Sequence, residues 1–146
     1  MAFLKHTELF DSLNNLAVKI DEKKKVLGTN SLSWPEQVVD KIWTALGVIE
    51  NGSFQYFIEC QMDTNLVAQA YDEIGLKAVG DLFRQADALL SPVSKDTQWD
   101  RQLRFMQQHE QELDDLATKV LGFTSEMELQ LSEYVKRNDQ IFSRLS

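Results

Sequence analysis

The sequence lacks most of the residue patterns that mark a catalytic or metal site. Cys60 is the only cysteine among 146 residues, so no disulfide can form within the chain. A catalytic thiol would need a neighbouring base, and the two histidines, His6 and His109, are both distant from Cys60 in sequence. We therefore expect Cys60 to be a buried core thiol. No glycine-rich phosphate loop and no metal-ligand spacing occurs, so the sequence predicts no enzyme, no catalytic residue, no metal and no cofactor.

Long apolar runs are also missing. None approaches the roughly 18 residues that a membrane-spanning helix needs. A signal peptide would need an apolar segment near the N-terminus, where this chain has Lys5, His6 and Glu8. We therefore expect a cytoplasmic protein without membrane contact.

Helix-breaking residues are scarce, with two prolines and six glycines in the whole chain. The length suits one domain over residues 1–146, and 43% hydrophobic residues are enough to form a core. Apolar residues recur at spacings of three and four, which is typical of amphipathic helices, and no strand-like alternation occurs.

Local signals give the helix boundaries. Ser33-Trp34-Pro35-Glu36 is a capping box with proline in the first turn, and Asn51-Gly52 ends the helix that follows. The pattern predicts seven helices, at about 7–26, 34–51, 54–61, 64–74, 76–90, 98–121 and 124–144. We expect a compact all-α domain in which the last two long helices form an antiparallel pair.

Negative charge is concentrated in the middle of the chain. The net charge is −8, and residues 59–118 hold twelve acids and five bases, a net charge of −7. Such a surface repels nucleic acid and attracts basic partners, although acidic charge also serves solubility. The densest run is 109–115, where Glu110 and Asp114 are four residues apart and repel one another by a few tenths of a kcal/mol. This cost is either retained for function or tolerated. The candidate partner-binding residues are Asp96, Asp100, Glu110, Glu112, Asp114 and Asp115.

Three short segments resemble a known family. Gly47-Val-Ile-Glu-Asn-Gly-Ser-Phe-Gln-Tyr-Phe-Ile-Glu59 is similar to an Asn-Gly-Gly-Phe-x-Gln-Phe/Tyr-Phe-x-Asn signature, with Ser53 in place of the second glycine and Glu59 in place of the last asparagine. Ile74-Gly75-Leu76 corresponds to an Ile-Gly-Ala step, and residues 131–142 resemble the family's C-terminal Tyr-Val…Phe ending. The match covers about residues 36–142 and resembles a bacterial family of unknown function whose characterised member is a DNA-mimic protein.

The resemblance implies an all-α fold, a homodimer, and an acidic surface that binds a DNA-binding transcription factor and blocks its operator. The signature residues are apolar or turn-forming, so they specify the fold, and mimicry would lie on the acidic face. Duplex DNA carries one charge per roughly 1.7 Å, so a 30 Å face would present about 18 charges. The twelve acids of residues 59–118 are fewer than that.

The leading hypothesis is an acidic protein-interaction domain that acts as a DNA mimic. Its partner would be a basic protein, such as a transcription factor or a nucleoid protein, and it would not contact nucleic acid directly. One alternative is an immunity or antitoxin-type protein that binds a toxin. A small-molecule enzyme is the remote alternative, because the sequence indicates no polar pocket.

Overall fold

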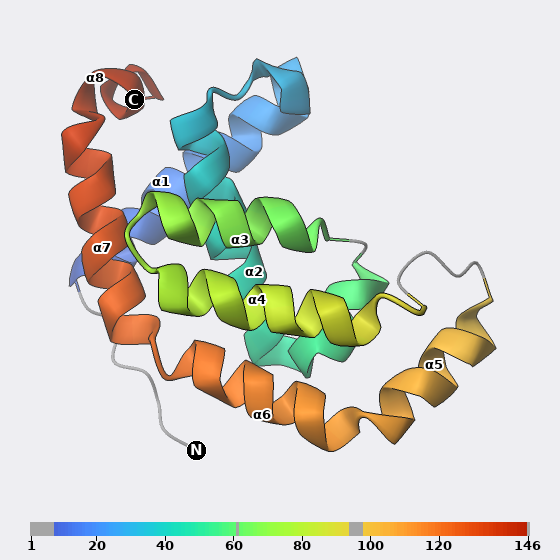
Figure 1. Ribbon diagram of the computed structural model, residues 1–146. Helices are drawn as coiled ribbons and strands as arrows, with labels where there is room; N and C mark the ends of the chain where they lie inside the picture. Colours follow the sequence, from blue (N-terminus) through green and yellow to red (C-terminus); the bar gives the residue numbers. More distant parts are fainter. Residues whose placement is uncertain (1–7, 61, 94–97, 146) are drawn as a thin grey trace.

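The protein is all-helical in its computed structural model, which describes residues 8–60, 62–93 and 98–145 (Figure 1). No strand occurs among these residues. The helices are α1 (Glu8–Leu27), α2 (Trp34–Glu59), α3 (Thr64–Glu73), α4 (Lys77–Leu90), α5 (Trp99–Gln108), α6 (Glu110–Leu121), α7 (Thr124–Arg137) and α8 (Asp139–Phe142), with 3-10 turns η1 (Thr29–Ser31) and η2 (Ser143–Leu145). The expected all-α class is confirmed.

Helix α2 begins at the predicted capping box. The Ser33 hydroxyl accepts a hydrogen bond from the Glu36 backbone N–H, and the Glu36 carboxylate accepts one from the Ser33 N–H at 2.9 Å. Glu36 is only 2% exposed and also pairs with Lys23 of α1 at 3.0 Å. The next residue of α1, Lys24, pairs at 3.2 Å with the buried Asp40, which lies one turn after Glu36 in α2. The last turns of α1 are therefore fixed to the first turns of α2 by two ion pairs.

The signature segment forms a sharp break in α2. Gly52 (φ −165°, ψ 24°) and Ser53 (φ 58°, ψ −162°) leave the helical conformation, and a short helical piece follows them in a new direction (Figure 1). The predicted end of a helix at Asn51-Gly52 is confirmed by this break. Ser53 is the only described residue other than glycine with a positive φ, and its buried hydroxyl has no hydrogen-bond partner among the described residues.

The break directs two phenylalanines of the signature into the core. Phe54 and Phe57 contact one another edge to face, with ring centroids 5.7 Å apart. Phe83 of α4 lies 5.4 Å from Phe54 and 5.6 Å from Phe57, and Tyr71 of α3 stacks on Phe83 at 5.4 Å. All four side chains are at most 1% exposed. Such ring pairs add about 0.5–1.5 kcal/mol each beyond the burial of their area.

Helices α3 and α4 form a tight hairpin beside this cluster. Gly75 makes the turn between them with φ 86°, which a side chain would disfavour. At Gly80 a Cβ atom would lie 2.9 Å from the Ala68 carbonyl oxygen of α3. The absence of a side chain at Gly80 therefore lets the two helices approach closely.

The two predicted long C-terminal helices are each divided. The helix predicted at 98–121 breaks at His109 (φ −113°, ψ 17°), which separates α5 from α6. The helix predicted at 124–144 breaks at Asn138 (φ −114°, ψ 30°) before α8. Helix α6 packs mainly on α2 and α4, and α7 packs on α1 (Figure 1). The expected antiparallel pair of long helices is not confirmed.

Cys60 lies in a different environment from the one that the sequence indicated. It ends α2 and is exposed, so the expectation of a buried core thiol is wrong. Its neighbour Tyr56 is also 40% exposed. The short helical piece after the break buries Phe54 and Phe57 only, and turns its other side to solvent.

We predict that Ser53→Gly stabilises the protein. A backbone conformation of this kind costs a residue with a side chain about 1–3 kcal/mol, and the glycine substitution loses about 0.5–1 kcal/mol through the entropy of the unfolded chain. The net gain in the free energy of unfolding should be about 1 kcal/mol, measured by urea denaturation. Gly52→Ala should have the opposite effect, because its Cβ would lie 2.5 Å from the Tyr56 Cβ. A loss of stability in Ser53→Gly would contradict this account of the break.

We also predict that Glu36→Gln destabilises the protein by about 2–3 kcal/mol at pH 7, because it leaves Lys23 without its buried partner. Burial favours the neutral carboxyl, but hydrogen bonds from Ser33 and Lys23 outweigh it and lower the pKa of Glu36. The stabilisation is therefore complete above the ordinary glutamate pKa of about 4.3 and is lost as pH falls through the lower folded-state value. Urea denaturation at pH 7 and pH 3 should show that the difference in the free energy of unfolding between the native protein and the variant is smaller at pH 3.

An exposed ion pair serves as the control. Asp21→Asn, which removes an exposed partner of Lys25, should cause a much smaller loss of stability at pH 7.

Candidate partner-binding surface

Nearly all the described acidic side chains lie at the surface. Only Glu36 and Asp40 are buried among them, and each is neutralised by a lysine of α1. The remaining carboxylates are exposed or half-buried, so the excess negative charge of the chain faces solvent.

Helix α6 presents the densest group of these acids. Its buried side consists of Leu113, Leu116, Ala117 and Val120, which turns the four predicted acids outward. Residues along an α-helix are separated by about 100°. Glu110 and Asp114 therefore lie close together on one flank, whereas Glu112 and Asp115 lie on the opposite flank. The structure brings the four residues onto one helix but divides them between its two sides.

The flank with Glu112 and Asp115 borders α4. Both residues line a hollow of about 510 Å³ between α4 and α6, with Leu89 and Leu116 contributing apolar surface and Lys119 a positive charge. Within α6, Gln111 Nε2 donates a hydrogen bond to Asp115 Oδ1 at 2.9 Å.

His109 holds the first turn of this flank. Its Nδ1 lies 3.2 Å from Glu112 Oε1, and its ring packs on Phe105 with centroids 4.5 Å apart. The carboxylates of Glu112 and Asp115 are thus both positioned by neighbours from their own segment. The break at His109 leaves the acidic run of residues 110–115 together on a separate helix, α6.

The flank with Glu110 and Asp114 has no such neighbours. Glu110 is exposed and Asp114 half-buried, and neither forms a salt bridge or hydrogen bond with a described side chain. Both carboxylates are therefore available to external cations.

The remaining two predicted residues do not join this group. Asp100 is exposed on α5, on the other side of the break at His109, and α5 also carries Arg101 and Arg104. Arg104 Nε donates to the Asp100 carbonyl oxygen at 3.4 Å. Asp96 lies outside the described residues. Helix α5 has two bases and one acid, so the strongly negative surface is centred on α6.

Several acids of residues 59–118 are neutralised by ion pairs, which a count of charges along the sequence does not reveal. Arg84 binds both Asp72 of α3 and Asp81 of its own helix, and Lys77 binds Asp81 at 3.1 Å. Asp87 on α4 is exposed and forms no salt bridge with a described residue. The net charge of −7 over residues 59–118 is therefore distributed unevenly, with α3 and the start of α4 nearly neutral.

A further pair of acids that influence one another lies outside this region. Glu50, near the end of the first part of α2, is exposed, yet nearby protein atoms reduce its solvation and the charge of Glu128 of α7 repels it, and both effects raise its pKa. Nothing in the sequence indicated this pair, because the two residues are 78 positions apart and meet only through the packing of the helices.

Other site types find little support in the geometry. Among the residues that the structure describes, no group of three or more histidine, cysteine or acidic side chains could hold a metal ion. None of the helices in the described part of the chain is long and apolar enough to cross a membrane.

Comparison with known proteins gives one match. The model of the DMP19-like protein family matches residues 30–138, most of the chain and nearly the whole of the region that carries the resemblance described above. Neither the curated proteins nor the solved structures contain a match. The matched region includes the broken α2, the α3–α4 hairpin and α6 with its acids. The chain belongs to the DMP19-like protein family.

Proposed function

We propose that this protein is an acidic interaction domain that acts as a DNA mimic. It binds a basic DNA-binding protein and occupies the lysine and arginine side chains that would otherwise contact phosphate. The observation that carries the proposal is the exposed acidic helix α6 within a chain whose family resemblance implies DNA mimicry. No catalytic role is proposed.

The rigidity of α6 supports this function. Leu113 is completely buried and Val120 is 2% exposed, so the helix is anchored along its length while its carboxylates face outward. A partner then meets charges that are already positioned, and less conformational entropy is lost on binding.

The charge density of α6 sets the extent of the mimicry. Twelve residues span about 18 Å, over which duplex DNA would carry about ten charges, whereas α6 carries four acids. One copy therefore imitates only a few consecutive phosphates. A homodimer that presents two copies of α6 would double the number of charges. We include the dimer in the proposal for this reason, and it stays a prediction, as does the cytoplasmic location.

The proposal predicts a partner that is captured through α6. We compare the native chain with the quadruple variant Glu110→Gln, Glu112→Gln, Asp114→Asn, Asp115→Asn in a pull-down from host lysate at low salt. Each exposed charge pair contributes about 0.2–1 kcal/mol, so the variant should lose about 1–4 kcal/mol of binding free energy. The purified partner should be released as salt rises, because ions screen exposed charges.

A matched control separates local from overall charge. Glu8→Gln, Asp11→Asn, Glu126→Gln and Asp139→Asn remove the same four charges from exposed positions on α1, α7 and α8, and should leave capture unchanged. The captured partner is then mixed with a labelled DNA duplex, and the native chain should displace the duplex. A ternary complex of chain, partner and DNA, or a partner held equally well by the α6 variant, would contradict the proposal.

A further inference from the structure

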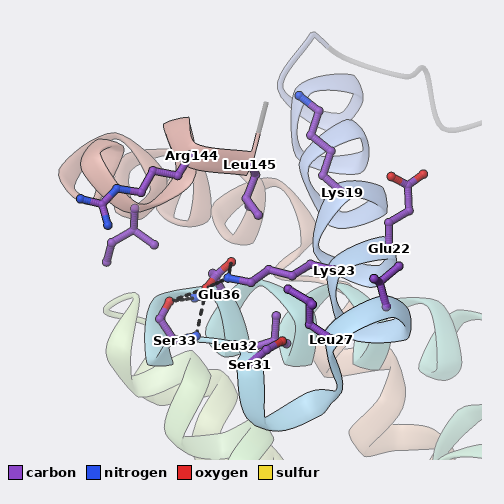
Figure 2. Close-up of a pocket in the computed structure, with 12 residues that line it drawn as sticks. Lys19, Glu22, Lys23, Leu27, Ser31, Leu32, Ser33, Glu36, Arg144 and Leu145 are labelled. Carbon is purple, nitrogen blue, oxygen red and sulfur yellow. Dashed lines mark hydrogen bonds and ion pairs between the residues drawn. The ribbon is translucent and has the colours of Figure 1, made fainter.

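Two hollows on the described surface differ in how fully their carboxylates are used. The larger, of about 750 Å³, lies between α1, the start of α2 and the C-terminal turns (Figure 2). Its central carboxylate, Glu36, accepts hydrogen bonds from Lys23 Nζ with both oxygens at 3.0 Å and from the Ser33 hydroxyl at 2.8 Å. Figure 2 shows Lys23 and Ser33 converging on Glu36, so both oxygens of this carboxylate are already engaged within the protein.

The hollow between α4 and α6 holds carboxylates that are only half used. Glu112 Oε1 lies 3.2 Å from His109 Nδ1, and Asp115 Oδ1 accepts a hydrogen bond from Gln111 Nε2 at 2.9 Å. The second oxygen of each carboxylate, Oε2 or Oδ2, forms no hydrogen bond with a described residue. His109 and Gln111 thus hold the two groups in place and leave one acceptor on each for a ligand.

The spacing of these two carboxylates suits one planar cation. Glu112 and Asp115 both line the hollow and are three residues apart on α6, so their Cβ atoms are separated by about 5–6 Å. A guanidinium group carries five N–H donors in a rigid plane and can donate to two carboxylates at once. An ammonium group is a compact and more strongly hydrated charge, so it loses more when water is displaced from it.

The hollow also offers apolar surface for the stem of such a side chain. Leu89 of α4 and Leu116 of α6 line it beside Ala88. The methylene groups of arginine pack on surface of this kind while the charged end stays at polar groups. Lys119 lines the same hollow one turn beyond Asp115 and forms no salt bridge with a described residue. Because Lys119 offsets part of the negative charge, the hollow suits one cation and not a run of them.

We propose that this hollow binds one arginine side chain of the basic protein that the proposed function requires as a partner. The guanidinium donates to the second oxygens of Glu112 and Asp115, and the stem packs on the two leucines. Glu110 and Asp114, on the opposite flank of α6, stay solvated and attract the partner without selecting between arginine and lysine. The site rests on the proposed function for the source of its arginine, but its chemistry is tested without the partner.

A peptide titration tests the site directly. Two blocked, alanine-based helical peptides, identical except for a single central arginine or lysine, are titrated into the ¹⁵N-labelled protein and followed by two-dimensional NMR. The arginine peptide should cause saturable shifts at residues 85–89 and 112–119, and the lysine peptide should bind at least about threefold more weakly. Shifts in α4 are decisive, because α4 borders the flank with Glu112 and Asp115. Equal binding of the two peptides, or no shift at 85–89, would overturn the proposal.

Two double variants of the same helix separate its flanks. Glu112→Gln with Asp115→Asn should weaken binding of the arginine peptide at least about fivefold, because both acceptors lose their charge. Glu110→Gln with Asp114→Asn makes the same chemical change on the opposite flank and should weaken binding less than about twofold. The NMR spectra of both variants verify that they are folded. An equal effect of the two double variants would refute the roles of Glu112 and Asp115.

Pull-down from host lysate with the native chain distinguishes this site from the function proposed above. A native chain that captures a basic DNA-binding protein but does not bind the arginine peptide at residues 85–89 would refute the site and leave DNA mimicry intact. A native chain that binds the peptide there but captures no basic protein would refute the mimicry and leave the hollow as an arginine site. If both proposals hold, the variant at Glu112 and Asp115 should lose more of the captured partner than the variant at Glu110 and Asp114.

Discussion

The fold depends on the break in α2 at Gly52 and Ser53. Without it, Phe54 and Phe57 would continue along the direction of α2 and would not meet Phe83 and Tyr71. The four rings, each almost completely buried, join α2 to the α3–α4 hairpin. Helix α6 then packs on both α2 and α4. The direction in which its acids face is therefore set by a turn more than 50 residues earlier in the chain.

The sequence predicted the parts of this arrangement that have local causes. The capping box at Ser33, the helix end at Asn51-Gly52 and the turn at Gly75 each follow from the conformational preferences of one or two residues. The apolar spacing predicted amphipathic helices, and in α6 it places Leu113 and Val120 on the buried side. These features give the all-α class and most helix boundaries, because a glycine or a cap acts in the same way in almost any surroundings.

The breaks at His109 and Asn138 have weaker local causes. Neither residue is glycine or proline, but the apolar stripe is interrupted at both breaks, because no apolar residue lies between Met106 and Leu113 or between Val135 and Ile141. Met106 and Leu113 are both completely buried on either side of the first break, so the change of direction preserves burial while it moves α5 away from α6. An interrupted apolar stripe does not by itself show that a helix breaks, because packing against other helices decides whether the helix continues, and packing is not visible in a single sequence. For the same reason, Asp100 was expected beside the acids of α6, and the neutralisation of Asp72 by Arg84 was not foreseen.

Charge and burial together decide which acids face solvent. The lysines of α1 are used first to neutralise Glu36 and Asp40, which removes the only buried negative charges among the described residues. The remaining described acids face solvent, and α6 carries the densest group of them, in which Glu110 and Asp114 form no ion pair with a described residue. A surface that binds through exposed charges stays solvated, so the fixed geometry of its carboxylates has to supply the specificity.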